Sequence, residues 1–188
     1  IAKEREHRFE SAQRFAEELE LFLEGAKERE RQEGIARELI KEAQTESLRY
    51  RQAQWELSRA LEQRDRLART TPPWAAEEQR SVLWASAQAV EELRVEVERA
   101  FGRTTRLLGQ SLSHSPLARA HEELAQLYWE RFVDAEDRDD RAMAAYFENL
   151  VRQHDQGQFV DRLNGLADLV VSCATPQVEL TLSRVHER

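Results

Sequence analysis

Apolar residues recur at three- and four-residue intervals along most of the chain. Between residues 11 and 23 the apolar positions are Ala12, Phe15, Ala16, Leu19, Phe22 and Leu23. This spacing gathers side chains on one face of a helix. Ser11 is a candidate N-cap and Gly25 a candidate stop, so we predict a first helix that ends near residue 25.

A longer segment, from residue 27 to residue 69, contains no proline and a single glycine, Gly34. Its pattern predicts one long helix, or two helices joined nearly end to end. Apolar and small residues form a narrow stripe close to the repeat of about 3.5 residues that is typical of coiled coils, and charged residues occupy the other positions. The stripe consists of Ala36, Leu39, Ile40, Ala43, Ser47, Tyr50, Leu57, Ala60, Leu61 and Leu67.

A stripe that narrow needs a partner helix, and the same chain supplies one. Thr70-Thr71-Pro72-Pro73 ends the long segment, because proline disfavours helix at and before its own position. Residues 74–112 then keep helical spacing, with Gly102 as a candidate bend or break. We therefore expect residues 26–112 to form a long antiparallel helical pair.

A second pair of helices is predicted further along the chain. Ser115 is a candidate cap, and Pro116 occupies the first helical position. Helical spacing continues from there to an acidic turn over residues 134–140 and a shorter helix that ends near Gly157. The pattern predicts an antiparallel helical hairpin over residues 113–156.

The hydrophobic period changes after Gly157. Residues 166–172 and 178–183 are strand-like, with Thr175-Pro176-Gln177 as a turn between them. The expected fold is therefore all-α: an elongated antiparallel bundle of repeat-like helical hairpins. A short β-hairpin or an extended tail is expected at the C-terminus, over residues 157–188.

Composition agrees with helices and excludes several classes of protein. Lys plus Arg total 28 and Asp plus Glu total 36, and the resulting net charge of −8 argues against a general binder of nucleic acid or anionic membranes. The 6 Gly and 4 Pro are too few for a β-sandwich or for a nucleotide-binding fold built on glycine loops. No apolar run reaches the ~18 residues of a membrane span. The single cysteine, Cys173, excludes an internal disulfide, so we expect a cytoplasmic protein.

Residues with catalytic or metal-binding chemistry show no spacing that is typical of a site. His114, His121 and His154 could gather as metal ligands, but no H-E-x-x-H or similar pattern accompanies them. The acidic cluster at residues 134–140 lacks the glycine and the closing glutamate of a calcium loop. Cys173 has no second cysteine, and no glycine-rich phosphate loop occurs. We predict no catalytic, cofactor-binding or metal-binding residue in this chain.

Four tryptophans are more than usual for a chain of 188 residues. Aromatic residues at helical spacing mostly pack between helices, whereas Trp74, next to Pro72-Pro73, is a candidate side chain for contact with a partner. The exposed face of residues 118–151 is a second candidate, by packing of helices in a groove. The predicted interaction surface for a protein or peptide partner consists of Trp74, Tyr128, Trp129 and Tyr146.

The first residues resemble the end of a protein kinase domain. Arg8-Phe9-Glu10-Ser11-Ala12, followed by Phe15-Ala16 and Phe22-Leu23, is similar to the closing sequence and last helix of the catalytic domain in bacterial eukaryotic-like Ser/Thr protein kinases. The resemblance implies that residues 1–25 are the end of such a domain. It also implies that Arg8 forms a structural ion pair with a glutamate of the Ala-Pro-Glu segment in the kinase lobe, which is not in this chain.

The rest of the chain resembles the helical region that follows the catalytic domain in large kinases of myxobacteria and their relatives. The similarity is carried by Leu124-Ala125-Gln126-Leu127-Tyr128, by Asp155-Gln156-Gly157 and by the run from Gly165 to Val171. Residues 118–154 also resemble a tetratricopeptide-type unit. In that kinase family a β-segment and a formylglycine-generating-enzyme-like domain often come next.

These resemblances imply a longer parent protein whose kinase domain binds ATP and Mg. Ile1 is not a usual first residue, so we expect the sequence to be a segment of that parent. The chain itself has no kinase glycine-rich loop, strand lysine, His-Arg-Asp or Asp-Phe-Gly motif, and we expect it not to be an enzyme.

The sequence supports three hypotheses of function. The first is a non-catalytic helical linker or scaffold that joins the parent's kinase lobe to a downstream domain and binds a protein partner. The second is a homodimerisation module that promotes activation of the kinase in trans, because the stripe from Ala36 to Leu67 could pair between copies. The third, a stand-alone helical-bundle metal enzyme, lacks the paired Glu-x-x-His ligands on facing helices that it would require.

Overall fold

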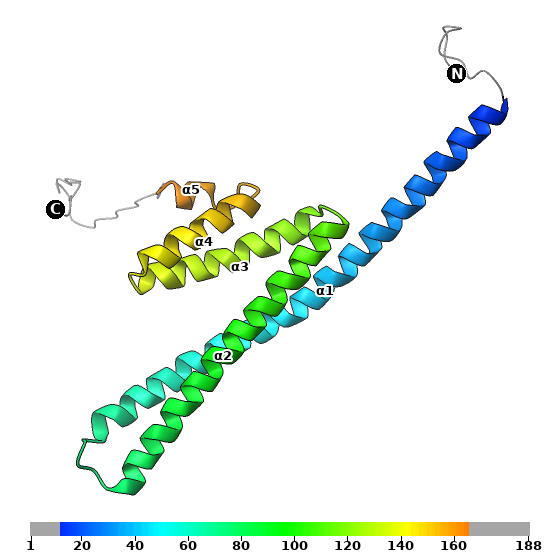
Figure 1. Ribbon diagram of the computed structural model, residues 1–188. Helices are drawn as coiled ribbons and strands as arrows, with labels where there is room; N and C mark the ends of the chain where they lie inside the picture. The colour runs from blue at the N-terminus through cyan, green and yellow to red at the C-terminus, as the bar shows by residue number, and fades with distance from the viewer. Residues whose placement is uncertain (1–11, 166–188) are drawn as a thin grey trace, which may run out of the picture.

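The computed structural model describes residues 12–165, which form five helices (Figure 1). They are α1 (Ala12–Thr70), α2 (Glu77–His114), α3 (Ala118–Asp137), α4 (Arg141–His154) and α5 (Val160–Leu163). Within that part of the chain there is no strand, as the predicted all-α fold requires. The β-hairpin predicted at residues 166–183 lies outside the described residues.

Helix α1 is one continuous helix of 59 residues, so the stop predicted at Gly25 is wrong. A glycine inside a helix costs about 1 kcal/mol relative to alanine, and strong helix formers surround both Gly25 and Gly34. Ion pairs one helical turn apart also support this stretch, between Glu28 and Arg31 at 2.8 Å and between Glu33 and Arg37 at 2.9 Å. At about 1.5 Å per residue the helix is roughly 90 Å long.

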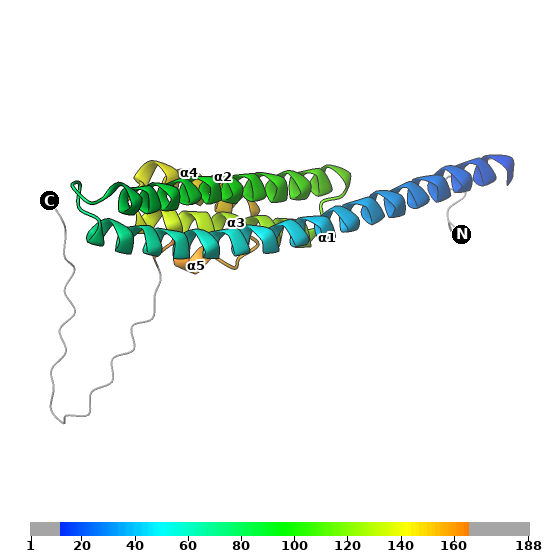
Figure 2. The same cartoon turned by 90° about the horizontal axis from the view of Figure 1, so that it is seen from below.

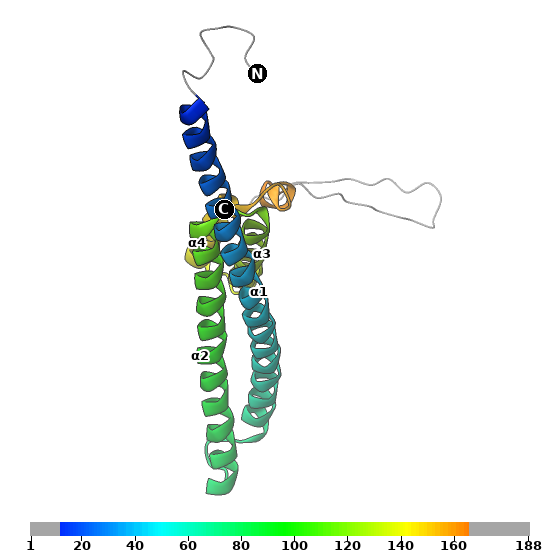
Figure 3. The same cartoon turned by 90° about the vertical axis from the view of Figure 1, so that its right-hand side faces the viewer.

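Helices α1 and α2 lie antiparallel along a seam of small side chains (Figure 3). The buried residues of the seam recur mostly at three- and four-residue intervals, as in a coiled coil. At one end of the seam, the Ser111 hydroxyl on α2 donates a 3.0 Å hydrogen bond to the main-chain carbonyl of Ala36 on α1. The buried residues of the seam are Ala36, Ile40, Ala43, Ser47, Tyr50 and Ala53 on α1, and Val90, Val97, Ala100, Thr104, Leu108 and Ser111 on α2.

Two predicted helix boundaries differ from the structure. Helix α2 runs through Gly102 without a break, and Ala100 and Thr104 on either side of the glycine are both buried. The next helix begins at Ala118 with Leu117 as its N-cap, two residues after the predicted first position, Pro116.

Helices α3 and α4 form the expected antiparallel hairpin, which lies along the α1–α2 pair (Figures 1 and 2). Residues 134–137 belong to the last turn of α3, so the turn itself is only residues 138–140. Asp139 takes a left-handed backbone (φ 54°), and the Asp140 carboxylate caps α4 by accepting the main-chain N–H of Met143 at 3.1 Å.

Two apolar clusters hold α3 against the first two helices. One contains Ile40, Ala43, Leu108, Ala120 and Leu124, and the other contains Tyr50, Ala53, Val97, Ala100 and Leu127. Each cluster draws residues from α1, α2 and α3, so the core is a column of three-helix layers.

A short helix, α5, was not predicted by the sequence pattern. The Asp155 carboxylate accepts the main-chain N–H groups of Gln158 at 2.8 Å and Phe159 at 3.1 Å, and so turns the chain after α4. Phe159 is buried against α3 and α4, in a cluster with Ala125 and Val151. In the described part of the chain, none of the helices is both long and apolar enough to cross a bilayer.

Because the seam is built of small residues, we predict that larger side chains there destabilise the protein. Replacing Ala100, which is fully buried, by leucine should lower the free energy of unfolding by about 1–3 kcal/mol, because the added methyl groups push α1 and α2 apart. Ala89→Leu, on the exposed face of the same helix, should change it by less than about 0.5 kcal/mol. Urea unfolding of both variants measures the difference, and equal stabilities would contradict the close-packed seam.

Candidate protein-interaction site

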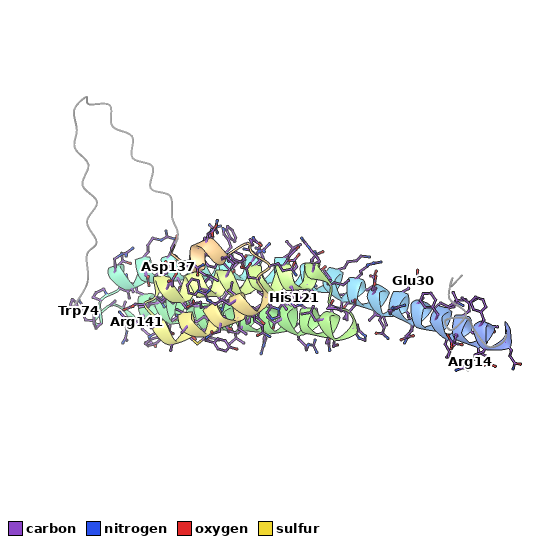
Figure 4. The ribbon with its side chains drawn as sticks, turned by 90° about the horizontal axis from the view of Figure 1, so that it is seen from above. Arg14, Glu30, Trp74, His121, Asp137 and Arg141 are labelled. Atoms are coloured by element: carbon purple, nitrogen blue, oxygen red, sulfur yellow. The ribbon has the colours of Figure 1, made fainter. Side chains whose placement is uncertain are left out.

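The predicted interaction residues do not form one surface. Trp74 is 84% exposed in the turn between α1 and α2, at the opposite end of the molecule from Arg14 (Figure 4). Tyr128, Trp129 and Tyr146 lie on the α3–α4 hairpin. Arg8 lies outside the described residues.

Tyr128 is mainly a packing residue. Its ring lies 6.1 Å from that of Phe101, 6.4 Å from that of Phe147 and 5.9 Å from that of His154, measured between centroids. Burial raises the pKa of its hydroxyl, with a smaller contribution from Tyr146. The side chain therefore joins α2, α3 and α4, and its hydroxyl stays protonated at neutral pH.

Trp129 and Tyr146 occupy different environments. Trp129 stacks on Phe159 with centroids 4.8 Å apart and planes at 14°, and the Arg162 guanidinium lies 5.8 Å from its ring. Tyr146 is 56% exposed and meets Phe147 edge to face at 5.2 Å. Of the two, Tyr146 is the one available to a partner.

Arg131, which no sequence pattern indicated, connects the α3–α4 hairpin to the α1–α2 pair. Its guanidinium lies 5.0 Å from the ring centre of Phe101 on α2 and 5.5 Å from that of Phe147 on α4. It also donates to Glu98 at 2.7 Å. Burial raises the pKa of the neighbouring Tyr50 hydroxyl to about 12, although the Arg131 charge opposes that shift. The sequence does not single out Arg131, because it is one of many charged residues at helical spacing.

A groove of about 620 Å³ opens beside Arg131, between the α1–α2 pair and the end of α3. Leu57, Leu61 and Val97 line it with apolar surface. The remaining lining residues are three arginines and four other polar residues: Arg94, Arg131, Arg138, Glu98, Asp134, Gln54 and Ser58. The side chains of Arg94 and Arg138 are at least half exposed, and surface ion pairs of this kind contribute little to stability.

The first part of α1 projects beyond the other helices (Figure 2). The last residue of α2, His114, meets Gln32 at 2.6 Å, so about 20 residues of α1 precede that contact and extend roughly 30 Å. On this overhang, residues 12–31, Leu19 is 45% exposed and Phe22 is 64% exposed. Both fall on the heptad positions that Ile40 and Ala36 occupy further along the helix, and Arg29 and Glu33 interrupt the apolar line between the overhang and the seam.

Two of the three histidines considered as metal ligands lie together. The Nδ1 atoms of His121, in the first turn of α3, and His154, the last residue of α4, are 2.9 Å apart. His114 lies elsewhere, beside Gln32. Among residues 12–165, no three side chains of His, Cys, Asp or Glu gather as a metal-binding set.

Comparison of the chain with models of protein families, with curated proteins and with solved structures finds no match. The function of this chain therefore has to be inferred from its own sequence and from the geometry of its own side chains.

Removing the Arg131 contacts should loosen the junction of the two hairpins. Arg131→Met keeps the length of the side chain but loses the charge on two aromatic faces and the pair with Glu98, so we expect a loss of about 1–2 kcal/mol in unfolding free energy. Arg141→Met is the control, since the Arg141 side chain is 89% exposed. Denaturant unfolding compares them, and a loss no larger than that of the control would exclude this role for Arg131.

The histidine pair predicts a specific pH dependence of stability. Burial, and next the charge on His121, lower the pKa of His154 below its usual 6.5. The free energy of unfolding is therefore highest above about pH 6.5. It declines as the pH falls through 6.5 towards the pKa of His154 in the folded chain, because His154 in the unfolded chain binds a proton more readily. Thermal unfolding between pH 7.5 and 5.5 should show this decline in the wild type and a flatter profile in His154→Gln. Identical profiles would contradict it.

Proposed function

We propose that this chain is a non-catalytic helical spacer and protein-interaction segment of a multidomain Ser/Thr protein kinase, joining the kinase lobe to a downstream domain. The kinase assignment is supported by the resemblance of residues 8–23 to the end of a kinase catalytic domain. The observation that carries the spacer role is α1: one unbroken helix whose first 20 residues extend beyond the bundle with apolar side chains exposed.

The overhang suits a helix that packs on a neighbouring domain. Leu19, Phe22 and Leu23 are each at least 45% exposed, on successive turns. Their burial against a partner would remove apolar surface from water at about 25 cal/mol per Å². The rest of α1 is anchored on α2 and α3, so a partner held at the overhang keeps a fixed direction relative to the bundle.

The groove beside Arg131 supports the interaction role. The exposed guanidinium groups of Arg94 and Arg138 can form paired hydrogen bonds to a carboxylate, and the apolar surface of the groove lies directly beside them. The chemistry favours a protein segment that carries both acidic and apolar side chains. Trp74, at the far end of the α1–α2 pair, offers a second contact for a downstream partner.

Self-association through the overhang is a second candidate function. The structure buries the stripe residues Ala36, Ile40, Ala43, Ser47 and Tyr50 within the bundle of the same chain, so that part of the stripe is already occupied. The heptad line of exposed apolar residues on the overhang remains, and it favours pairing between two copies, which would bring two kinase domains together.

Deletion in the parent protein tests the spacer role. Removing residues 27–155 should leave basal phosphotransfer to a generic peptide substrate intact, because this segment has no catalytic motif, while regulation or localisation of the parent changes. A matched pair of variants on the overhang refines the test: Leu19→Ala with Phe22→Ala should reproduce the change in regulation, and Glu20→Ala with Glu24→Ala should not. Loss of basal phosphotransfer in a normally folded deletion protein would contradict a spacer.

Light scattering separates the two candidates. A dimer through the overhang has twice the monomer mass of 22.0 kDa, and Leu19→Glu with Phe22→Glu should return it to the monomer. A monomer at high micromolar concentration removes the self-association candidate and leaves the spacer.

A further inference from the structure

The contact between His121 and His154 is a feature that the spacer role does not use. The two rings come from different helices and lie with centroids 5.1 Å apart and planes at 36°. One Nδ1 must donate and the other accept across the 2.9 Å contact, so at least one ring is neutral when it forms. Both residues are half-buried.

We infer that His121 and His154 form a two-histidine site for a divalent transition-metal ion that takes nitrogen ligands at right angles, such as Ni²⁺ or Cu²⁺. An ion bound at about 2.05 Å to two nitrogens that are 2.9 Å apart has an N–metal–N angle of about 90°. This is the angle between neighbouring ligands in square-planar and octahedral coordination. A tetrahedral zinc ion would need the two nitrogens to be about 3.3 Å apart.

The surroundings fit an open site with two protein ligands. Both rings bind the ion as neutral imidazoles, and the donor ring moves its proton from Nδ1 to Nε2, which frees its Nδ1 lone pair and replaces the hydrogen bond by the two metal–nitrogen bonds. Among residues 12–165 no third side chain of His, Cys, Asp or Glu joins the pair, so water completes the coordination. The neighbouring Asp155 carboxylate is already engaged by the main-chain N–H groups of Gln158 and Phe159.

A bound ion would act as a crosslink. It joins the first turn of α3 to the last residue of α4, directly before the turn that leads into α5. Since the ion binds the folded arrangement and not the unfolded chain, occupancy raises the stability of the hairpin.

Isothermal titration of the 188-residue chain with NiCl₂ at pH 7.5 tests the site. The expected result is one ion per chain, with a higher melting temperature in its presence. Loss of an outer-shell partner alone costs about 10- to 100-fold in metal affinity, so His121→Gln and His154→Gln should each lower the affinity at least as much. The control protein, with His7, His114 and His186 all replaced by Gln, should bind as the wild type does.

Circular dichroism at 222 nm shows whether each variant is folded. A variant that has wild-type helicity but no longer binds nickel lacks a metal-binding side chain and has kept its fold. Absence of nickel binding by the wild type would overturn the proposal. So would binding that survives in both single variants, or binding that is lost in the control protein. None of these outcomes bears on the spacer role, which does not depend on a metal.

Discussion

The close approach of α1 and α2 along a line of small side chains is the constraint on which the other features depend. Ala36, Ala43, Ala100 and Ser111 leave so little between the two backbones that a side-chain hydroxyl on α2 reaches a main-chain carbonyl on α1. Packing at this distance keeps two long helices side by side with few large apolar residues. It explains how a chain with 34% charged residues holds a rod-like structure: the core is narrow, but it is continuous along the rod.

The seam also fixes where the other elements can lie. Because α1 and α2 lie close together, α3 packs against both of them. Leu124 and Leu127 of α3 each belong to an apolar cluster that contains residues of all three helices. The α4 helix packs against α3, and Arg131 on α3 lies over the rings of Phe101 on α2 and Phe147 on α4. Because α2 ends at His114, the first part of α1 is left outside the bundle, and the candidate interaction surfaces lie where the seam ends: the overhang, the groove beside the end of α3 and the Trp74 turn.

Much of this arrangement could be predicted from the sequence, for physical reasons that differ between elements. The heptad line and the Pro72-Pro73 stop carry enough local information to predict the antiparallel pair and its turn. The continuation of α1 through Gly25 could not be predicted, because one glycine is a weak signal and the helix formers on both sides outweigh it. The role of Arg131 and the meeting of His121 with His154 depend on how α3 and α4 align across 33 residues of sequence, which periodicity does not encode. Helix α5 could not be predicted, because the turn before it forms only when the Asp155 carboxylate accepts hydrogen bonds from two main-chain N–H groups.

The central claim is that α1 is a single rigid rod from the overhang to the turn at Trp74. Dipolar spin-label distances test it most directly, with labels at Glu24 and Gln63 in a chain whose Cys173 is replaced by serine, so that the pair spans both Gly25 and Gly34. A continuous helix places the two Cα atoms about 58 Å apart, at about 1.5 Å per residue over 39 residues, with a narrow distribution. A broad distribution centred well below that distance would mean that α1 bends at its glycines, and would contradict the spacer.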